Sequence, residues 1–105
     1  MTQLDVNTGL YSPVTVVSAT GIQGDDVLVH TGACRLMFLA ASGETNSYVI
    51  VAHDATSETS PSYGVKHVVT PRYLDFGPVG IQMDIGIYIS LNGTGNLNWM
   101  VGYIA

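Results

Sequence analysis

The chain has 105 residues and a mass of 11.1 kDa, which is enough for one domain and too little for two. Only 10% of its residues are charged and 47% are hydrophobic, which excludes a disordered chain because disorder requires high charge and low hydrophobicity. Three Lys or Arg residues against eight Asp or Glu residues give a net charge of −5, which excludes nucleic-acid binding through a basic face. We therefore expect a single domain over residues 1–105.

The beginning of the chain differs from the rest, because residues 1–12 show little strand pattern. We expect them to form an N-terminal arm that packs on a neighbouring chain. Over the whole chain Val, Ile and Thr account for 30 of 105 residues, and these residues favour extended backbone. Alternating apolar runs between Gly, Ser and Asn predict short strands at 14–19, 26–31, 35–41, 48–53, 65–70, 73–76 and 97–104.

The clearest alternation lies between residues 81 and 91. All of its odd-numbered residues are Ile, Met or Leu, and its even-numbered residues, such as Gln82 and Asp84, are mostly polar. This pattern predicts a strand with one buried face, and Gly86 indicates a bend that splits the run into two shorter strands. Seven or eight short strands at this spacing predict an all-β fold, an antiparallel β-sandwich of which the jelly roll is one arrangement.

No motif in the sequence predicts catalysis, a cofactor or a metal site. His53 and Asp54 are neighbours in the chain, so in a strand their side chains point to opposite faces. Asp25 and Asp26 could hold a calcium ion, but a solvated turn is the favoured interpretation of such a pair. Cys34 is the single cysteine, and its apolar neighbours predict a packed, inert thiol. We expect a protein that is not an enzyme and needs no cofactor.

The low charge predicts that something covers part of the surface. Segments 35–41 and 48–53 are apolar on both faces, whereas each sheet of a sandwich has only one inner face. No apolar run reaches the roughly 18 residues of a membrane helix, so we expect another protein chain as the cover. The alternative is a neutral surface of Ser, Thr, Asn and Gly. The candidate interface residues are Met37, Leu39, Tyr48, Tyr73, Tyr88 and Trp99. Aromatic side chains also suit a sugar-binding groove, with core packing as the alternative, and this applies to Tyr11, Tyr63, Tyr73, Tyr88, Trp99 and Tyr103.

Two parts of the chain resemble small β-sandwich virion proteins of tailed bacteriophages. The first is 21–31 together with 34–41 and the valine-rich strand that ends at His53. The second, which matches better, is 78–95, where alternating apolar residues and Gly86 precede a Gly/Thr hairpin and the closing strand. The resemblance covers residues 14–105 and lies in strand pattern and turn residues.

This resemblance implies a non-enzymatic structural virion protein, in the first place a head decoration (cement) protein that stabilises the phage capsid through apolar contacts. It leaves open a tail, neck or fibre component with a receptor- or glycan-binding role. The implied partners are further copies of the chain, with a trimer favoured, and the major capsid protein or another virion protein, without nucleic acid or membrane. The expected location is the virion, assembled in the host cytoplasm, and the lone Cys34 and the lack of a leader pattern suit a reducing compartment.

Overall fold

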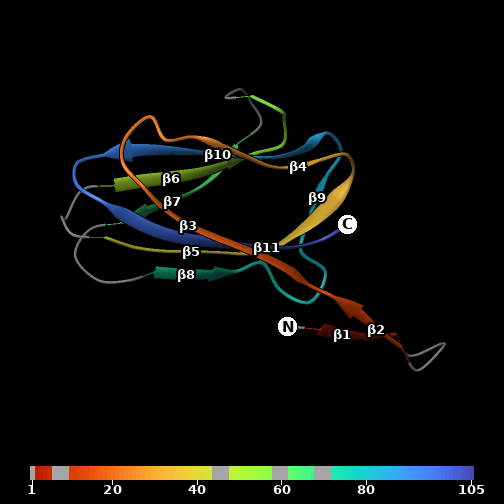
Figure 1. The fold of residues 1–105 in the computed structure, drawn as a ribbon. Coiled ribbons are helices and arrows are strands. Elements are labelled where there is room, and N and C mark those ends of the chain that lie inside the picture. The colour runs from red at the N-terminus through yellow and green to blue at the C-terminus, as the bar shows by residue number, and fades with distance from the viewer. Residues whose placement is uncertain (1, 6–9, 44–47, 58–61, 68–71) are drawn as a thin grey trace.

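The computed structural model describes residues 2–5, 10–43, 48–57, 62–67 and 72–105, and their regular structure is entirely β-strand (Figure 1). These residues contain no helix, and hence none that is long and apolar enough to cross a membrane. The strands are β1 (Thr2–Asp5), β2 (Leu10–Pro13), β3 (Thr15–Gly21), β4 (Val27–Thr31), β5 (Cys34–Gly43), β6 (Tyr48–His53), β7 (Ser62–His67), β8 (Arg72–Asp75), β9 (Ile81–Met83), β10 (Gly86–Gly93) and β11 (Leu97–Ile104).

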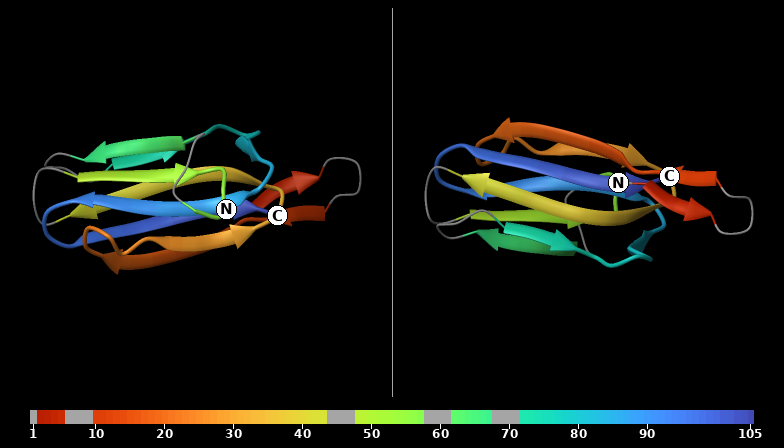
Figure 2. Two further views of the ribbon diagram at one scale, coloured as in Figure 1. Left: turned by 90° about the horizontal axis from the view of Figure 1, so that it is seen from above. Right: turned by 90° about the horizontal axis from the view of Figure 1, so that it is seen from below.

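Two antiparallel sheets pack face to face, which confirms the predicted all-β sandwich. The larger sheet has the order β3-β11-β5-β8, with β9 also paired to β5, and the smaller sheet has the order β4-β10-β6-β7. Figure 2 shows the smaller sheet from outside in its left view and the larger sheet in its right view. If β8 and β9, which pair with successive parts of β5, count as one interrupted strand, the strands from β3 onward have the orders 1-8-3-6 and 2-7-4-5, which is the jelly-roll arrangement.

The core lies between the two sheets, where the alternation of side chains directs the apolar residues of both sheets inward. The largest side chains that are completely buried come from three strands of the larger sheet, β5, β9 and β11, and from two strands of the smaller sheet, β6 and β10. They are Leu36, Leu39, Ile50, Met83, Ile87, Ile89, Leu97 and Val101. Burial of each such side chain contributes about 1.5–3 kcal/mol, so this layer is what holds the sandwich together.

The alternating run from residue 81 to residue 91 serves both sheets. Its first part, β9, pairs with β5 in the larger sheet, and its second part, β10, pairs with β4 and β6 in the smaller sheet. The predicted division at Gly86 is confirmed, and a Cβ atom at this position would overlap the carbonyl oxygen of His30. The expectation that Ile85 shares the buried face is wrong, because the chain changes sheets there and leaves Ile85 53% exposed.

A β-bulge in β5 accounts for much of the apolar character that the sequence places on two faces. Leu36 pairs with Tyr103 and Phe38 pairs with Gly102, so Met37 is an extra residue without a partner across the ladder. The buried positions are therefore even-numbered before the bulge and odd-numbered after it. Both sets face the same core, which corrects the expectation that β5 carries a complete second apolar face.

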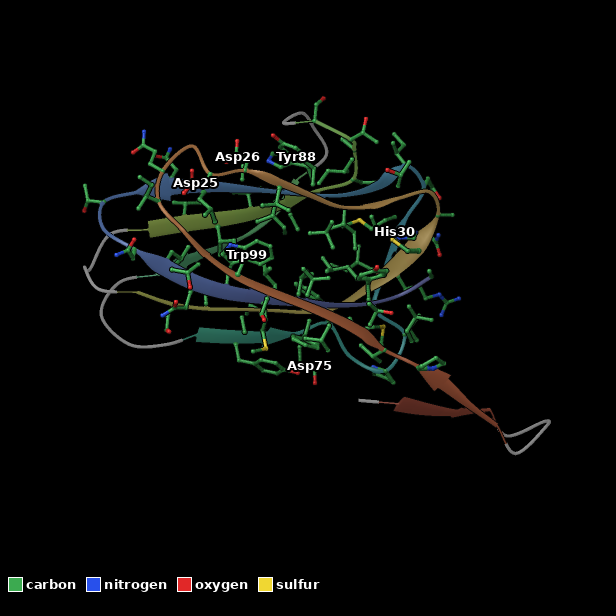
Figure 3. The ribbon with its side chains drawn as sticks, viewed as in Figure 1. Asp25, Asp26, His30, Asp75, Tyr88 and Trp99 are labelled. Carbon is green, nitrogen blue, oxygen red and sulfur yellow. The ribbon has the colours of Figure 1, made fainter. Side chains whose placement is uncertain are left out.

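Three of the residues predicted at an interface lie inside the chain. Leu39 is completely buried and Trp99 is 3% exposed, and Figure 3 shows Trp99 between the two sheets. Met37 is 7% exposed, because at the bulge its sulfur lies against Gly80, where an added Cβ would be 2.6 Å away. The prediction is therefore wrong for Met37, Leu39 and Trp99, which pack within the chain and offer almost no surface to a partner.

The N-terminal arm predicted at residues 1–12 contains a β-hairpin. β1 and β2 pair antiparallel, from Thr2 opposite Pro13 to Asp5 opposite Leu10, and they form a sheet of their own. Figure 1 shows the hairpin projecting beyond one end of the sandwich. The strand predicted at 65–70 begins earlier than expected, since β7 starts at Ser62, and residues 68–70 lie outside the described part of the chain.

Candidate functional site

The outer side of the larger sheet presents a surface with few charges, which we call the neutral face. Strand pairing places its side chains in three rows that run across β3, β11, β5 and β8. The first row contains Val16, Gly102, Phe38 and Asp75, the second contains Ser18, Met100, Ala40 and Tyr73, and the third contains Thr20, Asn98 and Ser42. Because side chains alternate along a strand, all these residues point away from the core.

The apolar members of the neutral face are exposed to different degrees. Tyr73 is 58% exposed, Val16 48% and Met100 41%, so the middle of the face presents three large apolar side chains. The Phe38 ring lies 5.4 Å from the Tyr73 ring, measured between centroids. Phe38 also covers Gly102, where a Cβ atom would come within van der Waals overlap of the ring, so glycine is required for the aromatic side chain to lie flat on the sheet.

A shallow depression of about 480 Å³ occupies the part of the neutral face beside β3. Tyr73 and Met100 form apolar parts of its lining, and Ser18, Ser42 and Asn98 contribute hydroxyl and amide groups. Thr20 donates a hydrogen bond from its hydroxyl to the Asn98 side-chain oxygen over 2.6 Å. The depression therefore combines apolar contact area with uncharged hydrogen-bonding groups, a composition that suits protein interfaces and small neutral ligands.

The charged side chains described near the neutral face lie at its margins. Asp75 ends β8 and accepts a hydrogen bond from the Gly77 backbone N–H over 2.9 Å, and in Figure 3 it points away from the sandwich below β8. Arg35 lies at the start of β5, where its guanidinium donates to the Val79 carbonyl over 3.4 Å. Between these two residues the rows are free of formal charge in the described residues.

The outer side of the smaller sheet has a different character. Leu28 is 45% exposed and pairs with Tyr88, while His53 and Ser90 are 6% and 8% exposed. The His53 Nε2 and Ser90 Oγ atoms are 2.9 Å apart, a spacing also found between a nucleophile and its base. Because both side chains are buried, we interpret this contact as a structural hydrogen bond between β6 and β10.

Asp54 fixes the crossover between the sheets. Its carboxylate accepts hydrogen bonds from the backbone N–H groups of Asp84 over 3.0 Å, Ile85 over 2.8 Å and Gly86 over 3.3 Å. Burial by itself raises the pKa of Asp54, but these three donors stabilise the carboxylate and hold the pKa below its ordinary value of 3.8. The carboxylate thus takes the place of a strand partner where the backbone passes from β9 to β10.

The remaining chemical candidates of the sequence have structural roles. Asp25 accepts a hydrogen bond from the Ile22 N–H over 3.0 Å, and Asp26 accepts one from the Leu91 N–H over 3.0 Å. These bonds fix the turn between β3 and β4, as the solvated-turn interpretation predicts. No group of three His, Cys, Asp or Glu side chains suited to a metal ion occurs in the described residues.

Cys34 is 4% exposed, as expected for a packed thiol. Burial, with a smaller contribution from the negative charge of Asp54, raises the pKa of Cys34 to about 11. The thiolate is the reactive form of cysteine, so a thiol with this pKa is inert near neutral pH.

The structure separates the aromatic residues that the sequence groups together. Tyr73 lies on the neutral face and Tyr88 on the outer side of the smaller sheet, so they do not belong to one site. Tyr48 begins β6, and its side chain lies outside the described part of the structure. Sequence reasoning missed Val16 and Met100; the alternation of Asn98, Met100 and Gly102 along 97–104 was the available signal for the outer face.

No protein-family model, curated protein or solved structure matches the chain.

Proposed function

We propose that the protein is a non-enzymatic structural component of a bacteriophage virion, a head decoration protein that binds the capsid through its neutral face. The resemblance in strand pattern suggests the class of protein, and jelly rolls are common in capsid proteins. Fold alone does not determine function, so the proposal depends on a surface. The observation that carries it is the group of exposed apolar side chains Val16, Met100 and Tyr73 on a face whose described charges lie at its margins.

Binding through such a surface stabilises a particle by mass action. Apolar area removed from water contributes about 25 cal/mol per Å², from which the costs of association are deducted. A protein that binds only the mature lattice shifts the equilibrium toward that lattice. The net charge of −5 reduces non-specific binding to nucleic acid during assembly.

The experiment compares particles that carry the protein with particles from which its gene has been deleted. The proposal predicts many copies per particle and a lower temperature of genome release when the protein is missing. Purified protein added back should restore the heat stability, whereas protein with Tyr73→Ser and Met100→Ser should not. If particles without the protein withstand heat as well as particles that carry it, the stabilising role is contradicted.

The second candidate is a tail, neck or fibre component that binds a receptor glycan. The depression on the neutral face favours it, since Tyr73 lines the same depression as the hydroxyl and amide groups of Ser18, Ser42 and Asn98, and sugars stack on aromatic rings while hydrogen-bonding to such groups. A low copy number and glycan-array binding that Tyr73→Ala abolishes would support this function. Trp99→Ala is not a suitable probe, because Trp99 is buried.

A further inference from the structure

The open edges of the two sheets differ in how they are protected against pairing with another chain. Natural edge strands avoid such pairing by charged side chains, prolines and bulges. β4 is interrupted by a register shift against β10, opposite Ile87 and Tyr88. β7 contains Lys66, and β8 contains Arg72 and Asp75. Three edge strands therefore carry a protective feature.

The fourth edge strand, β3, has none of these features. Its sequence TVVSATG contains no charged residue and no proline, and its pairing with β11 runs from Thr15 to Gly21 without a register shift. Five of its seven residues are exposed, and Val and Thr favour extended backbone. Among the described residues the strand pairs only with β11, so within this part of the chain the other side of its backbone has no strand partner.

We propose that β3 pairs antiparallel with β3 of a second copy of this chain, around a two-fold axis at Ser18. Ser18 is the middle residue of the strand, so in this register it faces Ser18 of the second copy. Val16 then faces Thr20, and Val17 faces Ala19. Every pair joins small or β-branched uncharged residues, which are compatible neighbours across an antiparallel ladder.

Symmetry favours a second copy over an unrelated chain, and the low charge of this region permits it. Two chains with a net charge of −5 repel each other, so copies have to meet where like charges do not face each other, as at β3 and the adjoining neutral face. An antiparallel pair of identical strands is self-complementary by symmetry. The pairing also joins the two neutral faces into one surface, because Val16, Ser18 and Thr20 belong to both β3 and that face.

This inference deepens the proposed function, since it names the partner at one margin of the neutral face, but it can fail separately. A single β3 edge accepts one partner, so the assembly in solution is a dimer and not the trimer that the resemblance favours. A protein that dimerises but is absent from particles contradicts only the proposed function. A protein that is abundant on particles but monomeric in solution contradicts only the inference.

The first test measures the mass of the full chain in solution by light scattering after size exclusion. We expect twice the chain mass of 11.1 kDa for the wild type and the single mass for Ser18→Lys, because two ammonium groups would meet at the axis. The substitution reduces the net negative charge, so general repulsion cannot explain a loss of dimer. Leu28→Lys places the same charge at an exposed position of edge strand β4 and should remain dimeric.

A wild-type monomer or trimer, or a Ser18→Lys variant that remains dimeric, overturns the proposal. A second variant keeps the test valid if Ser18→Lys fails to fold. Directly opposed residues of an antiparallel pair have Cα atoms about 4.5–5.5 Å apart, within the disulfide range of about 4.4–6.8 Å. Ser18→Cys should therefore form a disulfide-linked dimer on oxidation.

The controls for cross-linking come from the same chain. Wild-type protein should not cross-link, since its Cys34 is buried. Thr20→Cys should cross-link weakly, because in the proposed register Thr20 faces Val16 of the second copy. If Thr20→Cys forms dimers as readily as Ser18→Cys, or if neither variant forms them, the two-fold pairing at Ser18 is wrong.

Discussion

The crossover from β9 to β10 and the neutral face differ in how many of their polar and apolar groups find partners within the chain. At the crossover, one carboxylate binds three backbone N–H groups and Gly86 fits against the His30 carbonyl. On the neutral face, Tyr73, Val16 and Met100 remain about half exposed, and β3 has an open backbone edge. The difference indicates that the crossover supplies stability and that the neutral face is available for a partner.

The largest expected effect separates the interior from the neutral face. Trp99→Ala should lower the free energy of unfolding by about 4 kcal/mol, because it leaves a cavity between the sheets. Tyr73→Ala is the matched change on the neutral face and should alter stability by about 0.5 kcal/mol or less. Urea unfolding measures both. Equal losses in the two variants would contradict the assignment of Trp99 to the core and Tyr73 to the surface.

The next effect tests the crossover. Asp54→Asn should cost about 3 kcal/mol at pH 7, because an amide oxygen replaces a carboxylate that accepts three hydrogen bonds. Asp75→Asn removes a carboxylate that accepts one exposed hydrogen bond and serves as the control, with little loss of stability.

The pH dependence of the Asp54 contribution follows from the direction of its pKa shift. The folded-state pKa lies below the ordinary value of 3.8, so at low pH the unfolded state binds the proton more readily than the folded state. The contribution is therefore complete above that ordinary value and is lost as the pH falls through the folded-state pKa. The difference in stability between wild type and Asp54→Asn should shrink on acidification, and a difference that grows would contradict this account.

A smaller effect is expected where the neutral face is tightly packed. Gly102→Ala should cost about 2 kcal/mol, because the added methyl group displaces the Phe38 ring. Phe38→Ala in the same chain should recover most of this cost, since a side chain and not the backbone causes the clash. A double-mutant cycle measures the coupling, and additive costs would show that Gly102 is needed for another reason.

The smallest change in stability should accompany the largest change in binding. Tyr73→Ser with Met100→Ser alters exposed side chains and should change the free energy of unfolding by about 1 kcal/mol or less. The variant should nevertheless bind the particle poorly, which a lower number of copies per particle would show. Leu28→Ser on the opposite outer side is the control and should bind normally. Normal binding by the double variant would contradict the claim that the neutral face binds the particle.

Much of the sandwich follows from local sequence. β-branched residues and period-two alternation predict β3, β4, β5, β6 and β11 to within a few residues, because side-chain alternation is an intrinsic property of a strand. The division at Gly86 is also predictable, since glycine in a strand marks a bend or a close approach. The change of sheet at Ile85 was not predictable, because it depends on Asp54, a residue 31 positions away that binds this segment.

The candidate site was predictable only in part, for the same reason. The sequence identifies Tyr73, but it places Leu39 on an outer face because the bulge at Met37 reverses the alternation. A bulge depends on the pairing of two strands, here β5 and β11, and leaves no clear sign in one of them. Trp99 was assigned to an interface by residue type, whereas its position on the same face of β11 as Val101, between β3 and β5, makes it part of the core.

The most direct test of the account is the oxidation of Tyr73 and Met100 by hydroxyl radicals in free protein and in assembled particles, measured by mass spectrometry. Both side chains are exposed in the single chain, so both should be oxidised readily in the free protein. On particles we expect their oxidation to fall several-fold while that of Tyr88, on the opposite outer side, changes little. Equal oxidation of Tyr73 and Met100 in the two states would contradict the claim that the neutral face binds the virion.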